Sequence, residues 1–275
     1  MQRTRGMLAV CVAIATPAMA QEAINTPSAT QPAKGVAALR LQTRVFRLGN
    51  DPTGLDRDAT VLSQSATLTY GLSRNASISL RMPIALRHEV DAGELDREFG
   101  FEDASIEAKY RVWQRDTGAI NFQRIALVVG SELPTGTGDL SSHSFDPYVG
   151  AVFTGVWGRH GINQSVRYKF NTGTDEYPLL PGQGEDDALY LDTAYLYRFS
   201  PDVYRAGTEA SFYGVVELNT LYETGGDWET LLSPGVLYEA RRFAVEAGVQ
   251  VPVFERVETH PEVEWGFVIG FRVLF

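Results

Sequence analysis

Apolar and polar residues alternate one by one over long stretches of this chain, and residues 262–275 show the pattern most clearly. Every second position there is large and apolar: Trp265, Phe267, Ile269, Phe271, Val273 and Phe275. Because successive side chains of a β-strand point to opposite faces, the pattern predicts a strand with one apolar face. That face must meet either a second sheet or lipid.

The same alternation recurs in eleven earlier segments, so that we expect twelve strands. Their approximate ranges are 37–47, 60–72, 76–87, 103–113, 121–133, 147–157, 161–171, 188–199, 209–219, 230–240, 243–253 and 262–275. Short turns, such as 73–75 and 241–242, alternate with long loops, such as 48–59 and 88–102. This asymmetry and a final aromatic residue, Phe275, are typical of outer-membrane barrels. The sequence therefore predicts an all-β fold, a transmembrane antiparallel up-and-down β-barrel of about twelve strands.

The N-terminal residues have the features of an export signal. Arg3 and Arg5 precede a short apolar run, and Ala18 and Ala20 form a small-residue cleavage site, so residues 1–20 are interpreted as a signal peptide cut between Ala20 and Gln21. Residues 21–36 lack periodicity and are rich in Ala, Pro, Ser, Thr and Gln. We expect them to be a flexible periplasmic lead-in, too short to plug a barrel. The barrel domain then covers residues 37–275.

Composition narrows the class of function. The formal net charge of the chain is −10; the predicted signal peptide removes only Arg3 and Arg5, which leaves −12 for the mature chain. Nucleic-acid binding favours basic surfaces, so this balance argues against it. The sole cysteine, Cys11, lies in the signal peptide, and we expect neither disulfides nor cofactors in the mature protein. The acidic residues gather in the long loops, where they either bind divalent cations beside lipopolysaccharide or form solvated surface.

Charged residues recur on the face opposite the apolar one, where they would line the barrel lumen. The inward-facing candidates are Arg40, Arg44, Arg81, Glu107, Lys109, Arg111, Glu132, Arg167, Lys169, Asp192, Glu217, Glu246 and Arg272. All except Arg40, Asp192 and Glu246 are taken as candidates for solute selectivity, because rings of charge in a water-filled lumen set selectivity. The alternative is that these charges pair across a narrow barrel and seal it. Twelve strands lie between filled eight-stranded barrels and open porins, so size does not decide.

Two other classes of function are a hydrolase and a surface-binding barrel. A hydrolase needs a nucleophile with an oriented histidine and acid, and the best cluster is Ser141, Ser142, His143 and Ser144 with Asp146. Neighbours this close along a loop rarely reach triad geometry, so we expect no enzyme. The other class is a surface-binding barrel that acts through its acidic loops and the aromatic residues Tyr177, Tyr222 and Trp228.

Five short phrases, in this order, resemble the outer-membrane family called the MetA-pathway of phenol degradation. They are Tyr70-Gly71-Leu72-Ser73, Arg81-Met82-Pro83, Gly100-Phe101-Glu102-Asp103-Ala104-Ser105 followed by Lys109-Tyr110-Arg111, Leu133-Pro134-Thr135-Gly136, and Pro234-Gly235-Val236. This chain has Glu102 where the family pattern has glycine. The resemblance implies an outer-membrane β-barrel that moves small molecules, with aromatic or phenolic compounds as candidates.

These observations predict a channel or facilitator for small molecules in the outer membrane of a Gram-negative bacterium. The alternative is a sealed structural or surface-binding barrel. The expected partners are outer-membrane lipid and lipopolysaccharide, a small-molecule solute, and the barrel-assembly machinery, which would recognise the C-terminal strand ending at Phe275.

Overall fold

The structure, a computed structural model, describes residues 22–275 except 92–93, 119 and 206. The strands are β1 (Ala37–Gly49), β2 (Asp58–Gly71), β3 (Ala76–Asp91), β4 (Glu94–Phe101), β5 (Ala104–Asp116), β6 (Phe122–Leu133), β7 (Asp146–Trp157), β8 (His160–Lys169), β9 (Ala188–Ser200), β10 (Ala210–Glu223), β11 (Trp228–Ala240), β12 (Phe243–Arg256) and β13 (Glu262–Leu274). A 3-10 helix, η1, covers Gly138–Leu140. No helix within the described ranges has the length and apolar character needed to span a membrane. The predicted signal peptide and its cleavage site, Ala20 and Gln21, lie outside the described residues.

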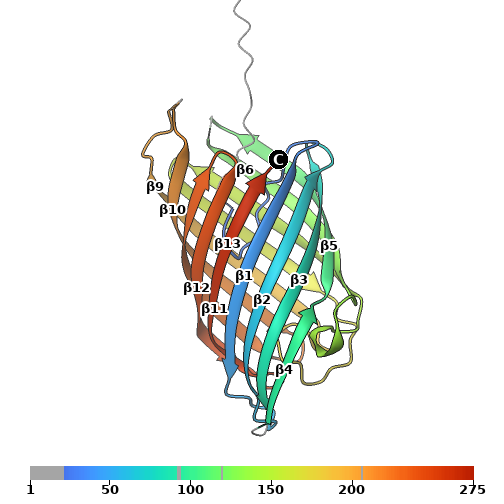
Figure 1. Ribbon diagram of the computed structural model, residues 1–275. Helices are drawn as coiled ribbons and strands as arrows, with labels where there is room; N and C mark the ends of the chain where they lie inside the picture. Colours follow the sequence, from blue (N-terminus) through green and yellow to red (C-terminus); the bar gives the residue numbers. More distant parts are fainter. Residues whose placement is uncertain (1–21, 92–93, 119, 206) are drawn as a thin grey trace, which may run out of the picture.

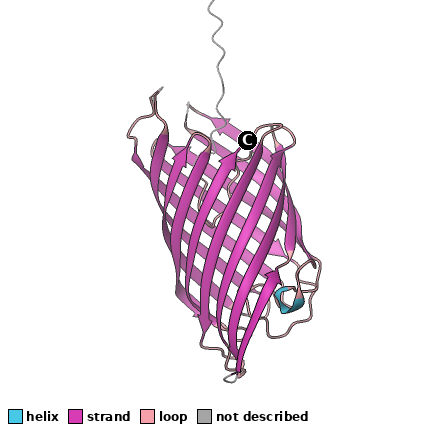
Figure 2. Ribbon diagram, in the orientation of Figure 1, coloured by secondary structure: helices cyan, strands magenta, loops and turns pink. Residues whose placement is uncertain are grey.

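The strands form one closed antiparallel barrel (Figures 1 and 2). Closure comes from β1, which pairs with β2 on one side and with β13 on the other. The β1–β13 ladder runs from Ala38 opposite Leu274 to Gly49 opposite Glu262. A closed sheet has no exposed strand edge and satisfies its backbone polar groups internally.

β4 accounts for the one strand beyond the predicted twelve. It pairs with the second half of β3, from Ile84 opposite Phe101 onward, while β5 pairs with the first half, up to Arg81 opposite Ser105. β4 and β5 therefore occupy one position in the wall, interrupted at Glu102 and Asp103. The expectation that 88–102 is a long loop was wrong: most of it extends the β3 hairpin, and the charged residues 96–98 interrupt the outward apolar series of Leu95, Phe99 and Phe101.

The predicted alternation of faces is confirmed. Large apolar side chains on the outer face remain exposed, for example Leu41, Leu68, Val129, Phe267 and Ile269. Their neighbours in sequence point inward and are mostly buried. In β9, where tyrosines and leucines stand next to each other in sequence, Ala194, Leu196 and Arg198 are buried, and the tyrosines at 195 and 197 point outward.

The two ends of the barrel differ. The turn end, upper in Figure 1, holds the short turns and both ends of the barrel wall, where the Ala37 amide hydrogen-bonds to the Phe275 carbonyl oxygen (2.9 Å). The loop end, lower in Figure 1, holds β4 and the longer loops. A four-residue turn at 72–75 joins β2 to β3, whereas 170–187 joins β8 to β9 at the loop end.

Residues 22–36 do not form an external lead-in. The structure folds them back into the barrel, where Ala23, Ile24 and Ala29 are at most 1% exposed. The expectation of a flexible periplasmic lead-in was therefore wrong: even an irregular chain of this length reaches across a twelve-stranded barrel when inward side chains satisfy its backbone.

Candidate functional site: the lumen and its N-terminal segment

The lumen is lined by the charged residues that the sequence pattern placed there. All thirteen inward-facing candidates lie on the inner face, in positions that alternate with the exposed apolar residues. Their use differs sharply. Some hold the N-terminal segment, some bond to other residues of the wall, and some form no ion pair within the described residues. Their role in solute selectivity stays a prediction.

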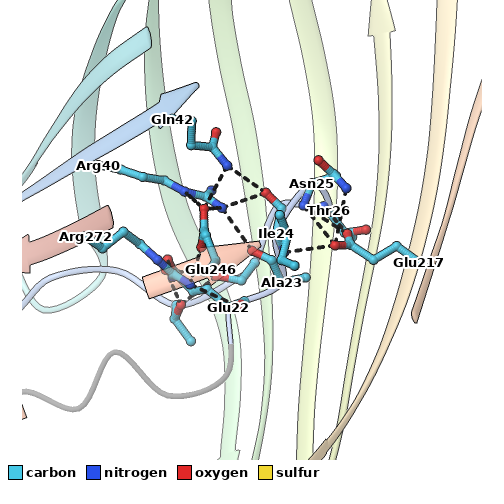
Figure 3. A network of polar contacts seen from close by, with 12 residues as sticks. Glu22, Ala23, Ile24, Asn25, Thr26, Arg40, Gln42, Glu217, Glu246 and Arg272 are labelled. Carbon is cyan, nitrogen blue, oxygen red and sulfur yellow. Dashed lines mark hydrogen bonds and ion pairs between the residues drawn. The ribbon is translucent and has the colours of Figure 1, made fainter. Parts of the chain in front are cut away.

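Glu217 of β10 holds the N-terminal segment through its backbone. Its carboxylate accepts hydrogen bonds from the amides of Ile24 (2.9 Å), Asn25 (3.0 Å) and Thr26 (2.6 Å), as Figure 3 shows. Glu217 is fully buried. A buried carboxylate is costly unless it is paired or hydrogen-bonded, and three converging amides meet that need.

A second group of side chains holds the segment from the neighbouring wall (Figure 3). Arg40 of β1 donates to the Ile24 carbonyl oxygen (2.6 Å) and to Glu246 of β12 (2.6 Å). Arg272 of β13 bridges Glu246 (2.9 Å) and Glu22. Two arginines thus compensate two carboxylates, one from the wall and one from the segment.

Glu22 stays ionised in this group. Burial raises its pKa, but the positive charges of Arg272, Arg40 and Lys109 outweigh that effect and lower the pKa to about 2. The same carboxylate also accepts a hydrogen bond from the Thr30 hydroxyl (2.8 Å), which folds the segment back on itself. The ion pairs of Glu22 are therefore present at any pH near neutral.

The segment also reaches the opposite wall. Lys109 of β5 donates to the Ser28 carbonyl oxygen (2.8 Å), and the Ala29 amide donates to the Thr154 hydroxyl of β7 (2.8 Å). Ala29 packs among Ala126, Val128 and Val152. Since β7 lies half-way round the barrel from β1, residues 22–30 cross the lumen and obstruct it.

Two glycines, Gly71 and Gly235, make room for the segment; both belong to the short phrases that resemble the family. A Cβ on Gly71 would collide with the Ala33 carbonyl oxygen, and one on Gly235 would collide with Ile24. The Gly71 amide also donates to the Val36 carbonyl oxygen (3.0 Å). Sequence reasoning missed the occupied lumen; these inward glycines on otherwise regular strands were the available signal, since such glycines often mark close approach of another backbone.

Three of the candidate cations, Arg44, Arg81 and Arg167, do not touch the segment and form no ion pair within the described residues. Arg167 lies over the rings of Tyr190 (4.3 Å to the centroid) and Tyr148 (5.1 Å). Arg44 makes one long hydrogen bond, to Gln250 (3.5 Å), and within the described residues no ion pair shorter than 4.0 Å involves Arg81. The lumen thus offers positive charge beside aromatic rings.

The remaining selectivity candidates are paired within the wall. Lys169 binds Glu132 (2.8 Å), Arg111 donates to the Arg74 carbonyl oxygen and to Asn75, and Glu107 accepts from the Tyr148 hydroxyl (3.5 Å). The Lys169 and Glu107 contacts join strands two positions apart in the sheet, β8 with β6 and β7 with β5, and Arg111 ties β5 to the turn between β2 and β3. These contacts leave the side chains less free to meet a solute.

The serine–histidine cluster at the loop end has no triad geometry. The Ser142 hydroxyl donates to Asp103 (2.7 Å) and the Ser144 hydroxyl to Asp146 (2.8 Å). His143 is exposed, and over the part of the chain that the structure describes its ring has no hydrogen bond to any of these serines or acids. Asp103 instead anchors the loop, because it also accepts from the amides of Thr135 (3.0 Å) and Gly136 (2.8 Å).

The loop end also has a cavity of about 430 Å³. Its lining combines Arg57 and Arg87 with Leu140, Leu179 and Leu180. Both arginines are already engaged: Arg57 binds Asp51 (2.7 Å), and Arg87 binds Glu98 (2.9 Å). The cavity is therefore a recess at the loop end whose two arginines are already paired with carboxylates.

Comparison with known proteins identifies relatives of this barrel. A family model described as "Putative MetA-pathway of phenol degradation" matches residues 25–262. No curated protein sequence matches.

Three solved structures illustrate the fold. The COG4313 outer membrane channel from Pseudomonas putida F1 has a TM-score of 0.65 at 10% identity, covering 92% of this chain and all of that one. The β-domain of the Bordetella autotransporter BrkA has 0.51 at 13%, covering 88% and 100%. The translocator domain of NalP from Neisseria meningitidis has 0.50 at 12%, covering 90% and 91%. At such identities the likeness concerns the fold alone.

Proposed function

The chain belongs to the family of the MetA-pathway of phenol degradation and folds as a Gram-negative outer-membrane barrel of a channel-like class, and from that premise we propose that it passes small aromatic molecules through a lumen that residues 22–32 obstruct. The turn end then faces the periplasm and the loop end faces the cell exterior. Passage requires that the segment shift.

The observation that carries this proposal is the way in which the segment is held. Within the described residues, 22–30 form no strand pairing and are bound by side chains such as Glu217, Arg272 and Thr154. Gly35, with a φ of 79°, precedes the first wall strand, and a glycine there is a natural hinge. Water or a solute can replace side-chain hydrogen bonds of this kind one at a time, whereas the hydrogen bonds between two strands break together.

The solute class follows from the inward arginines that neither hold the segment nor form an ion pair within the described residues. Arg167 beside Tyr148 and Tyr190, with Arg44 and Arg81 nearby on the inner face, suits a ring that carries a negative or hydrogen-bonding group. Cation–π and stacking contacts favour the ring, and the guanidinium favours a carboxylate or phenolate. Phenol and benzoate are the simplest molecules with these properties.

Planar-bilayer conductance of the mature protein tests the proposal. We expect low conductance from the intact chain, a clear increase when residues 22–32 are deleted, and a block by benzoate that cyclohexanecarboxylate, which lacks the aromatic ring, does not match. Arg167→Lys should weaken the benzoate block by about threefold to tenfold, because lysine keeps the charge but loses the planar face. A deleted protein that folds but remains non-conducting would instead favour the sealed, surface-binding barrel.

We also propose that the terminal strand serves assembly and that the acidic loops meet lipopolysaccharide. The support for the assembly role is the outward aromatic series of β13, in which Phe271 is 41% exposed, and Phe275 directly after the strand, which is 66% exposed. Deleting Phe275 should slow insertion by the barrel-assembly machinery in reconstituted vesicles. An unchanged insertion rate would refute the role of that residue.

A further inference from the structure

A buried cluster at the loop end, separate from the lumen segment, combines one histidine with several carboxylates. Glu223 ends β10, Asp227 lies in the turn that leads to β11, and His260 lies in the loop before β13. Their side chains are 1–5% exposed. His260 Nε2 is 3.4 Å from Glu223 Oε2 and 4.0 Å from Asp227 Oδ2, and the three ligand atoms lie within 4.8 Å of one another.

The histidine ring is oriented as a metal ligand would be. Its Nδ1 is 2.9 Å from the Pro261 carbonyl oxygen. A carbonyl oxygen only accepts hydrogen bonds, so Nδ1 carries the proton, and in the neutral ring the lone pair of Nε2 then faces the two carboxylates. A backbone carbonyl that fixes the second ring nitrogen in this way is the usual support of a metal-binding histidine.

A fourth side chain gives independent support. Glu229 of β11 is 5% exposed, and its Oε2 has no hydrogen-bond partner; the same is true of Glu223 Oε2. Glu229 lies opposite Glu255 in the β11–β12 ladder and opposite Leu221 in the β10–β11 ladder, which places it beside the cluster. Buried carboxylate oxygens without a donor are costly, and a cation removes that cost.

The excess of negative charge around His260 also favours a bound cation. Four carboxylates, those of Glu223, Asp227, Glu229 and Glu255, gather around His260, and across the described ranges no lysine or arginine forms an ion pair with any of them. A single imidazolium would still leave an excess of negative charge in a buried place. A divalent ion would compensate two of these charges directly.

We propose that Glu223, Asp227 and His260, with Glu229 as a further oxygen donor, bind a divalent transition-metal ion of the zinc class. One imidazole nitrogen with two or three carboxylate oxygens is a donor set that zinc accepts, whereas calcium and magnesium prefer oxygen alone. Tetrahedral ligands at about 2.1 Å from zinc are about 3.4 Å apart, so the Nε2–Glu223 distance fits and Asp227 needs a small shift.

The metal would join three outer loops. Asp227 already accepts hydrogen bonds from the amides of Glu258 (2.8 Å) and Thr259 (3.0 Å), which ties the β10–β11 turn to the β12–β13 loop. Glu223 Oε1 accepts from the Gly182 amide (3.0 Å) in the 170–187 connection. A bound ion between Glu223 and His260 would lock these three segments over one side of the barrel mouth.

Titration calorimetry of the mature, tag-free, EDTA-treated protein with zinc chloride tests this site. We expect one zinc ion per chain, a visible absorption band typical of tetrahedral coordination when cobalt(II) replaces zinc, and at least about tenfold weaker binding in His260→Gln and in Glu229→Gln. His143→Gln, which changes an exposed histidine of another loop, should bind zinc as the unchanged protein does.

Each other outcome overturns the assignment. Zinc binding that survives both His260→Gln and Glu229→Gln, or that His143→Gln weakens equally, would place the ion elsewhere. Calcium binding at equal affinity would exclude a zinc-class site. Glu229→Gln keeps the size of the side chain, so it tests the site even if His260→Gln fails to fold, as judged by heat-modifiable migration on a gel.

Discussion

Glu217→Ala should release the N-terminal segment without unfolding the barrel. The substitution removes the acceptor for the amides of Ile24, Asn25 and Thr26. Hydrogen bonds to a charged acceptor contribute about 1.5 kcal/mol each at the low end, or about 4.5 kcal/mol for three. Water that fills the space left by the carboxylate offsets part of this loss, so we expect a net effect of about 3 kcal/mol.

That energy corresponds to a shift of roughly 150-fold in the equilibrium between bound and released segment, at about 1.4 kcal/mol per tenfold. Hydrogen exchange of the folded protein in detergent, followed by mass spectrometry, measures this equilibrium directly. Amides of residues 24–26 should exchange about two orders of magnitude faster, while amides in β10 and β1 keep their protection.

Glu107→Ala is the matched control. Glu107 is also an inward glutamate, but its hydrogen bond goes to the Tyr148 hydroxyl (3.5 Å) and not to the segment. It should leave exchange at residues 24–26 unchanged. Unchanged exchange in Glu217→Ala, or equal acceleration in both variants, would refute the view that the Glu217 carboxylate holds the segment.

Two further predictions concern the loop end and the lipid face. Burial raises the pKa of Asp51, but hydrogen bonds from Arg57 and Thr53 outweigh this effect and lower the pKa to about 2. This is below the value of about 3.9 in the unfolded chain. The ionised carboxylate therefore stabilises loop 50–57 fully above about pH 4, and this stabilisation is lost as the pH falls through about 2. Hydrogen exchange at the amides of Thr53 and Arg57, corrected for intrinsic rates, should become faster as the pH falls over that range. In Asp51→Asn it should not depend on pH in this way. Exchange that does not change with pH in the unchanged protein would contradict a lowered pKa of Asp51. Ile269→Arg, on the outer face of β13 between Thr43 and Ala247, should lower the free energy of unfolding in lipid vesicles by about 2–4 kcal/mol. A urea titration showing a change under about 0.5 kcal/mol would mean that this face does not meet lipid at its midplane.

The barrel wall was predictable because its signal is local. Trp265, Phe267 and Ile269 face outward for the same reason that Gly266 and Val268 face inward, and the period of two needs no information from distant residues. Lipid imposes that period only where a strand crosses the bilayer. In β4 the charged residues Asp96, Arg97 and Glu98 interrupt the outward series of Leu95, Phe99 and Phe101, and this interruption makes the segment resemble a loop in sequence.

The occupied lumen was not predictable from the pattern, because its contacts are distant in sequence and irregular in space. Glu217 holds Ile24 across a separation of 193 residues, and Arg272 meets Glu22 across 250. A segment that satisfies its backbone through side chains needs neither of the two periods that sequence reasoning detects. The cluster around His260 was missed for the same reason, since its members come from two separate parts of the chain, residues 223–229 and 255–260.

Because residues of the N-terminal segment lie in the lumen, the inward charged residues fall into two groups with different expected roles. Lys109, Glu217 and Arg272 contact the segment directly, so replacing one of them should alter how often the lumen is open. Arg44, Arg81 and Arg167 do not contact it, so replacing one of them should alter which solute passes through an opened lumen. Conductance in the presence and absence of residues 22–32 separates these effects, because a variant of the first set loses its phenotype when the segment is deleted and a variant of the second set keeps it.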